Sequence, residues 1–176
     1  MSGVAEPFVV RPGQSRVDGA ILPFKASAAD TGGQLSVCEF TLGPWEPGPV
    51  LHKHDETDEG FYVIAGVLEA QLGEQRIQAD AGSFVWVPRG IPHAFANAGP
   101  DELHVLSLVL PGGIEALFAE QATYFSNLDG PPDPVALDEM GRRHGAHTVG
   151  PPIVAEGAPE APSESRYGGR AGVPGA

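Results

Sequence analysis

Between residues 21 and 110 the chain alternates short apolar segments with glycine or proline turn signals. Strands of four to eight residues joined by tight turns give a repeat of about ten residues, whereas helices need longer uninterrupted patterns. The pattern therefore predicts an all-β protein, either a sandwich or a closed antiparallel barrel. The apolar segments are 21–24, 35–42, 50–54, 60–65, 67–72, 76–78, 84–87, 92–96 and 103–110.

The pattern changes after the Pro-Gly-Gly sequence at residues 111–113. Ile114, Leu117 and Phe118 recur at helical spacing, which predicts a helix over residues 114–125. A second short helix is predicted near residues 134–144, where an aspartate and a proline suit the first turn and a glycine suits the end.

These segments predict three parts. Residues 1–125 form a β-barrel with N-terminal strands and a following helix, and residues 126–150 form a short helix and a loop that pack on the barrel. Residues 151–176 are rich in proline, glycine, alanine and glutamate. Such a composition buries little apolar surface, so we expect a disordered tail there.

The charge balance excludes several classes of partner. Ten basic residues against 23 acidic ones give a formal net charge of -13 at pH 7, which argues against nucleic acid and against an anionic membrane surface. No apolar run approaches the roughly 20 residues that span a bilayer, and the first ten residues do not resemble a signal peptide. The lone Cys38 suits a reducing compartment and reads as a core residue, so we expect a cytoplasmic protein.

Two stretches carry the side chains that bind metals. His52 and His54 alternate along one predicted strand, so both imidazoles lie on one face, about 7 Å apart. Glu59 follows a short polar link and is in phase with Phe61, which places a carboxylate among interior apolar residues. A buried carboxylate needs a compensating charge, and a metal ion is one way to supply it.

The second stretch follows a proline- and glycine-containing loop. There His93 is in phase with Phe95, so it too faces the interior. A lone histidine on a strand is more often a core or surface residue than a ligand. Three imidazoles and one carboxylate facing one interior instead predict a site for a borderline divalent metal, with His52, His54, Glu59 and His93 as its ligands.

With these motifs the chain resembles the cupins over about residues 30–112. The first cupin motif is matched by the His-x-His pair, Glu59 and Gly66, although Gly48 lies closer to His52 than the opening glycine of the family pattern. The second motif is matched without a gap by Gly82, Pro88, Gly90, His93 and Asn97. The resemblance implies an antiparallel cupin β-barrel, or jelly roll, here with one or two short C-terminal helices, and metal binding by the four residues named above.

By the same resemblance, small cupins with this ligand set include dioxygenases that open oxygenated aromatic rings, such as quercetinases. We therefore expect a metal-dependent dioxygenase that takes dioxygen and a small aromatic or polyketide- or flavonoid-like substrate. Glu59 would remain a ligand or accept the substrate proton as general base. Phe61 and Phe95 share phase with the ligands and are expected to border the substrate pocket.

Two alternatives stay open at the level of sequence. The same site suits a non-redox isomerase, cyclase or decarboxylase, and a cupin can also bind a small molecule without catalysis. One divalent transition metal is expected, with iron, manganese, nickel or cobalt favoured and copper or zinc compatible. Exposed edge strands and the family resemblance together predict a homodimer.

Overall fold

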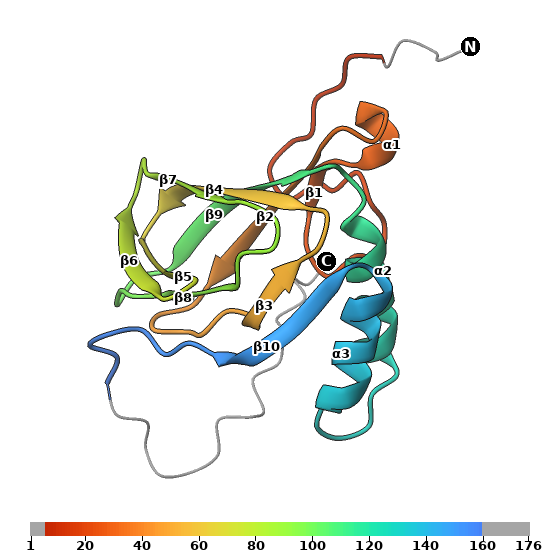
Figure 1. Cartoon of the computed structure of the whole chain (residues 1–176). Helices are drawn as coiled ribbons and strands as arrows, with labels where there is room; N and C mark the ends of the chain where they lie inside the picture. Colours follow the sequence, from red (N-terminus) through yellow and green to blue (C-terminus); the bar gives the residue numbers. More distant parts are fainter. Residues whose placement is uncertain (1–5, 160–176) are drawn as a thin grey trace.

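The computed structural model of the chain describes residues 6–159 (Figure 1). It contains ten strands and three short helices within that range. In chain order these elements are β1 Phe24–Ala26, α1 Ala28–Thr31, β2 Ser36–Leu42, β3 Val50–His54, β4 Asp58–Ala65, β5 Val67–Leu72, β6 Gln75–Asp80, β7 Phe84–Val87, β8 His93–Asn97, β9 Leu103–Leu110, α2 Glu115–Ser126, α3 Pro134–Arg143 and β10 Ala146–Pro152.

The strands form two antiparallel five-stranded sheets. Sheet I has the order β1-β2-β9-β4-β7, and sheet II has the order β10-β3-β8-β5-β6. Only β1–β2 and β5–β6 are successive strands of one sheet, and every other connection between successive strands crosses from one sheet to the other. This arrangement confirms the predicted all-β jelly roll, and α2 and α3 confirm the two predicted helices.

Alternation of inward and outward side chains, clearest in β9, builds the core between the sheets. In β9 every second residue is buried, and its partners in β2 and β4 alternate in register with it. One apolar cluster fills the space between the sheets, and a second lies where α2 and α3 pack beside the sandwich (Figure 1). Cys38 belongs to this second cluster and is 2% exposed, which confirms its reading as a core residue.

The loop that was predicted at the end of the 126–150 segment is instead a strand, β10. It pairs antiparallel with β3, with Ala146 opposite His54 and Thr148 opposite His52, so it forms the edge of sheet II. Its prolines are tolerated because an edge strand needs only half of its hydrogen bonds and because the register shifts on either side of Gly150. The pairing joins segments more than 90 residues apart, which local sequence cannot reveal.

The prediction of a disordered tail from residue 151 onward is also wrong for its first nine residues. Ile153 and Ala155 are 6% and 5% exposed, and they pack on Ala94 and Ala96 on the outer face of sheet II. Residues 151–159 therefore belong to the folded structure, because the apolar side chains of Ile153 and Ala155 cover a surface lined by alanines. The rest of the predicted tail, residues 160–176, lies outside the described residues. Within the described range, no helix is long and apolar enough to cross a membrane.

Candidate metal centre

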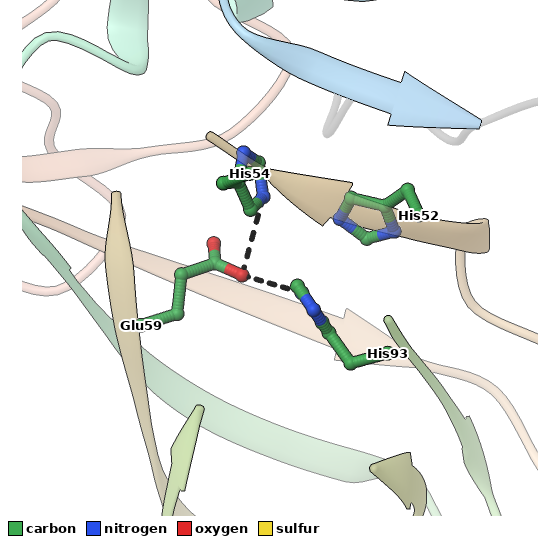
Figure 2. Close-up of side chains that lie close together, drawn as sticks. All are labelled: His52, His54, Glu59 and His93. Carbon is green, nitrogen blue, oxygen red and sulfur yellow. Dashed lines mark hydrogen bonds and ion pairs between the residues drawn. The ribbon is translucent and has the colours of Figure 1, made fainter. Parts of the chain in front are cut away.

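Four residues from three strands converge at one end of the space between the sheets (Figure 2). His52 and His54 come from β3 and His93 begins β8, all on sheet II, while Glu59 comes from β4 on the facing sheet I. Each residue offers one ligand atom, and these atoms all lie within 4.8 Å of one another. The structure thus brings together the four residues that the sequence motifs single out.

Strand register sets the positions of the imidazoles. His52 and His93 lie directly opposite each other on paired strands, and their ring centroids are 4.4 Å apart. The ring of His54 lies two residues further along β3, with its centroid 5.0 Å from that of His52 and 5.5 Å from that of His93. Three imidazoles therefore surround one point opposite the Glu59 carboxylate.

Backbone carbonyls orient two of these rings. Nδ1 of His52 lies 2.8 Å from the carbonyl oxygen of Val50, and Nδ1 of His93 lies 3.0 Å from that of Ile91. A carbonyl only accepts hydrogen bonds, so in both rings Nδ1 donates its proton and Nε2 is left as the coordinating nitrogen. Outer contacts of this kind are what fix the tautomer of a metal-binding histidine.

The contact between His93 and Glu59 tests whether a cation fits. Nε2 of His93 lies 2.7 Å from Oε2 of Glu59. Because Nδ1 of His93 already carries a proton, a neutral ring would direct the Nε2 lone pair at an anionic oxygen. That repulsion disappears only if a positive charge, either a proton or a metal ion, lies between the two atoms.

His54 gives an independent indication of a missing partner. Its side chain is 4% exposed, and neither ring nitrogen has a hydrogen-bond partner among residues 6–159. Nε2 lies 3.4 Å from Oε2 of Glu59, but this approach lacks hydrogen-bond geometry. Buried polar atoms are rarely left unpaired, since each loses hydration worth about 1–3 kcal/mol. A metal ion bound to this imidazole would remove that deficit.

The electrostatics favour the ligand-competent forms of Glu59 and His52. Burial acts to raise the pKa of Glu59, but the imidazoles of His54 and His93 outweigh it and hold that pKa below its usual range. Burial lowers the pKa of His52 to about 4. Glu59 is therefore an anion and His52 is neutral at neutral pH, which are the states that bind a metal. For His93, burial acts to lower the pKa, but the Glu59 carboxylate raises it overall.

An aromatic cluster lies beside the candidate ligands. The ring of Phe61 is 6.4 Å from that of His93 and 5.3 Å from that of Phe95, measured between centroids. Phe40 stacks on Phe95 with a centroid distance of 4.8 Å. These rings pack in the core between the sheets, with Phe61 only 3% exposed, so the role expected for Phe61 and Phe95 in a substrate pocket stays a prediction.

Two further residues of the second motif have structural contacts. The amide of Asn97 donates to the carbonyl oxygens of Gly43 and Asp101 at 2.8 and 2.7 Å. Arg89 forms an ion pair with Asp58 at 2.8 Å, and its backbone amide donates to the same carboxylate. The sequence analysis missed this link, which ties the loop before His93 to the residue beside Glu59. No local pattern signals a pair 31 residues apart.

Comparison with known proteins supports the motifs. A family model described as "Cupin domain" matches residues 38–109. A quercetin 2,3-dioxygenase from Bacillus subtilis (strain 168) is 23% identical over 129 residues. That match spans 72% of this chain but only 38% of the relative, so the chain covers well under half of that protein.

The solved structure of KdgF agrees with the fold. KdgF from Halomonas sp. is 19% identical with a TM-score of 0.51, and the match covers 63% of this chain and 98% of that one. A predicted oxalate decarboxylase from Thermotoga maritima is 20% identical with a TM-score of 0.49, covering 51% and 78% of the two chains. The resemblance to the cupins, and to quercetinase-type proteins among them, is confirmed. A divalent metal suits the candidate ligands, and the same donor set is compatible with several of these ions.

Proposed function

We propose that this small cupin is a metal-dependent dioxygenase that acts on a small aromatic, polyketide-like or flavonoid-like substrate. The observation that carries the proposal is the convergence of three imidazoles and one carboxylate in a buried site, with both nitrogens of His54 unpartnered among the described residues. The likeness to a quercetin 2,3-dioxygenase supports the type of reaction.

In this proposal His52, His54, Glu59 and His93 hold one divalent transition metal. Iron, manganese, nickel or cobalt is favoured, and copper or zinc is compatible with the same donors. When bound, such an ion supplies Lewis acidity toward a substrate oxygen and, where redox-active, electron exchange with dioxygen. His52 is the most exposed of the four ligands, so substrate would approach from its side of the site.

Glu59 is proposed to accept the proton of a substrate hydroxyl. Both of its contacts to imidazoles use Oε2, which leaves Oε1 as the oxygen that meets an incoming proton. The low pKa of Glu59 keeps it deprotonated before substrate arrives, as a general base requires. Removing the hydroxyl proton would leave an electron-rich substrate anion, which is the form that reacts with dioxygen.

The aromatic rings beside His93 support an apolar substrate. The ring of Phe61 lies beside that of His93, the ring of Phe95 lies beside that of Phe61, and aromatic side chains favour flat apolar molecules. We propose that these two residues border the substrate pocket. A cytoplasmic location is proposed as well, since the single buried Cys38 forms no internal disulfide.

The decisive experiment joins elemental analysis with an oxygen comparison. Freshly purified protein is analysed for transition metals before any is added, and aromatic substrates are then tested with and without dioxygen. We expect about one divalent metal per chain and turnover that consumes oxygen. Undiminished turnover without oxygen would overturn the dioxygenase assignment, and protein that never holds metal would favour a non-catalytic small-molecule-binding module.

A non-redox reaction is the second candidate. The pairing of an ionised buried carboxylate with imidazoles is also suited to moving protons during isomerisation, cyclisation or decarboxylation. Under this alternative the substrate is converted at the same rate in anaerobic and aerobic buffer. Zinc-substituted protein would then be as active as protein with a redox-active metal, which separates the two candidates.

A further inference from the structure

The loop between β7 and β8, residues 88–92, connects the two sheets beside the candidate ligands. It leaves sheet I after Val87, the register partner of Glu59, and enters sheet II at His93. Only five residues separate these two positions. The path of this loop therefore sets where His93 lies relative to Glu59, the candidate ligand on the facing sheet (Figure 2).

Arg89 ties this loop to β4. Its guanidinium contacts the Asp58 carboxylate through two nitrogens, with Nη2 2.8 Å from Oδ2 and Nε 3.1 Å from Oδ1. The backbone amide of Arg89 also donates to Oδ1, at 2.8 Å. A two-point contact from a planar guanidinium fixes direction as well as distance. Asp58 directly precedes Glu59, so the loop is held against the start of the strand that carries the candidate carboxylate ligand.

Backbone hydrogen bonds tie the same loop to two of the histidines. The amide of Gly90 donates to the carbonyl oxygen of His54 at 2.7 Å, and the carbonyl oxygen of Ile91 lies 3.0 Å from Nδ1 of His93. Gly90 has a φ of 79°, a left-handed conformation that turns the chain directly after Arg89. The Arg89 contact is thus separated by a single residue from the carbonyl that orients the His93 ring.

The exposure of the ion pair points to positioning rather than to folding stability. The side chains of Arg89 and Asp58 are 49% and 23% exposed. Ion pairs exposed to this extent contribute little to the free energy of unfolding, because water screens them. Loss of a contact that orients a metal-binding histidine, in contrast, weakens metal binding by about 10–100-fold. A displacement of the loop should therefore be felt at the metal site more than in the overall stability.

We propose that Arg89 and Asp58 are positioning residues that hold His93 opposite Glu59. Arg89 acts through the carbonyl of Ile91, and Asp58 acts through the start of β4. Together they maintain the 2.7 Å separation between Nε2 of His93 and Oε2 of Glu59. The inference rests on the proposed role of the four residues as metal ligands, and it is independent of whether the reaction uses dioxygen.

The charge of Arg89 distinguishes positioning from a simple electrostatic effect. A positive charge near a cation site repels the cation, so electrostatics alone predicts that Arg89→Met tightens metal binding. Positioning predicts the opposite, because the loop loses its two-point contact with Asp58. Arg89→Lys keeps the charge but not the planar fork, so positioning predicts that it also weakens binding.

The first test measures cobalt(II) affinity of full-length variants by competition with a chromogenic chelator, with circular dichroism as the check on folding. We expect about 10-fold weaker binding in Arg89→Met and in Arg89→Lys. Adding Asp58→Asn to Arg89→Met should weaken binding little further than the larger single change, since both substitutions break one pair. Unchanged or tighter binding in folded Arg89→Met would overturn the proposal.

Arg16→Met is the matched control. Arg16 likewise contacts a carboxylate, that of Asp30, through two guanidinium nitrogens, and its side chain is 42% exposed. Its backbone amide bonds to β1, which β2 and β9 separate from β4 in sheet I. The control therefore removes the same charge and the same type of contact away from the candidate ligands. It should bind cobalt as wild type does, and an equal loss in Arg16→Met would overturn the proposal.

A second test needs no bound metal. The proton between Nε2 of His93 and Oε2 of Glu59 should give a low-field imidazole resonance in chelator-treated full-length protein, and His93→Ala should lack it. We expect this resonance to broaden or disappear in Arg89→Met and to persist in Arg16→Met. An unchanged resonance in Arg89→Met would overturn the proposal. Wild type that never binds metal would refute the proposed function instead, and the resonance would then decide by itself whether Arg89 positions His93.

Discussion

Two buried glutamates, one on each sheet, show how partner chemistry differs between the candidate metal centre and a structural ion pair. Glu59 and Glu69 are 8% and 2% exposed. Oε1 of Glu69 accepts a hydrogen bond from Nε of Arg76 at 2.9 Å and also pairs with Nη2 of the same guanidinium. Its Oε2 accepts from the side-chain amide of Gln78 and from the backbone amide of Glu156, at 3.1 and 2.9 Å.

Among residues 6–159, no such permanent cation contacts Glu59. Its contacts are the imidazoles of His54 and His93, which are neutral or charged according to conditions and which bind metals when neutral. An arginine is always charged and cannot bind a metal, so Arg76 neutralises the Glu69 carboxylate under all conditions. Burial acts to raise the pKa of both carboxyls, and their partners lower both, so burial and pKa direction alone do not distinguish them. The two carboxyls are distinguished by the neighbouring His54, whose ring nitrogens have no hydrogen-bond partner among the described residues.

The largest effect is expected from Glu59→Gln, which keeps the volume and removes the charge. If Glu59 is the general base, turnover should fall by about 100-fold or more, whereas metal affinity falls less because an amide oxygen still coordinates weakly. Steady-state kinetics on metal-loaded protein, with metal content measured in parallel, checks this. Equal losses of turnover and metal affinity would assign Glu59 a ligand role only. Glu69→Gln is the matched control on the other sheet and should leave turnover unchanged.

Breaking the Glu69 pair should act on stability instead. Arg76→Met leaves a buried carboxylate without its cation, and we expect the free energy of unfolding to fall by about 3 kcal/mol. Part of this loss also reflects the hydrogen bond from Arg76 to the carbonyl oxygen of Val154, at 2.8 Å. Urea unfolding measures the change. Metal content should stay at the wild-type level, and a parallel loss of metal would contradict the separation of the two sites.

The burial of Glu59 can be predicted from the sequence, whereas that of Glu69 cannot. Glu59 could be placed because alternation puts it in phase with Phe61 inside the sandwich, and because the histidine motifs lie on strands that the sequence identifies. Glu69 alternates with the core residues Leu68 and Ala70 and therefore reads as a solvated outer residue. Arg76 and Gln78 contact its carboxylate, and the segment that contains Glu156, 87 residues away in the sequence, also binds it.

The same reason explains what was missed elsewhere. Strand β10 has the glycine and proline content of a loop, and its identity as a strand comes from the β3 edge that it covers. The ion pair of Asp58 with Arg89 joins the first residue of β4 to the loop before β8, and these segments are distant in the sequence. Local periodicity therefore predicted the strands and the candidate ligands, whereas long-range pairing between irregular segments required the structure.

Removing one imidazole should affect metal binding more than folding. His93→Ala takes away a candidate ligand and the partner of Glu59, so we expect metal affinity to fall by roughly 100-fold or more, since the loss of a residue that only orients a ligand already costs about 10–100-fold. Competition with a chromogenic chelator measures the affinity, and circular dichroism checks that the barrel is folded. His147→Ala is the control, since His147 pairs with Asp55 outside the cluster. Unchanged affinity in His93→Ala would remove this residue from the ligand set.

The smallest of these effects concerns the segment that covers Glu69. Ending the chain after Pro152 removes buried Ile153, the carbonyl oxygen that binds Arg76 and the amide that binds Glu69. Burial of one isoleucine contributes about 1.5–3 kcal/mol, so we expect a loss of about 2 kcal/mol. Ending the chain after Pro159 is the control and should change stability by less than about 0.5 kcal/mol, as expected from the composition of the residues removed. Thermal unfolding of both proteins measures the difference. Equal stability of the two would show that residues 153–159 do not support Glu69, and the contrast between the two carboxylates would then rest on Arg76 alone.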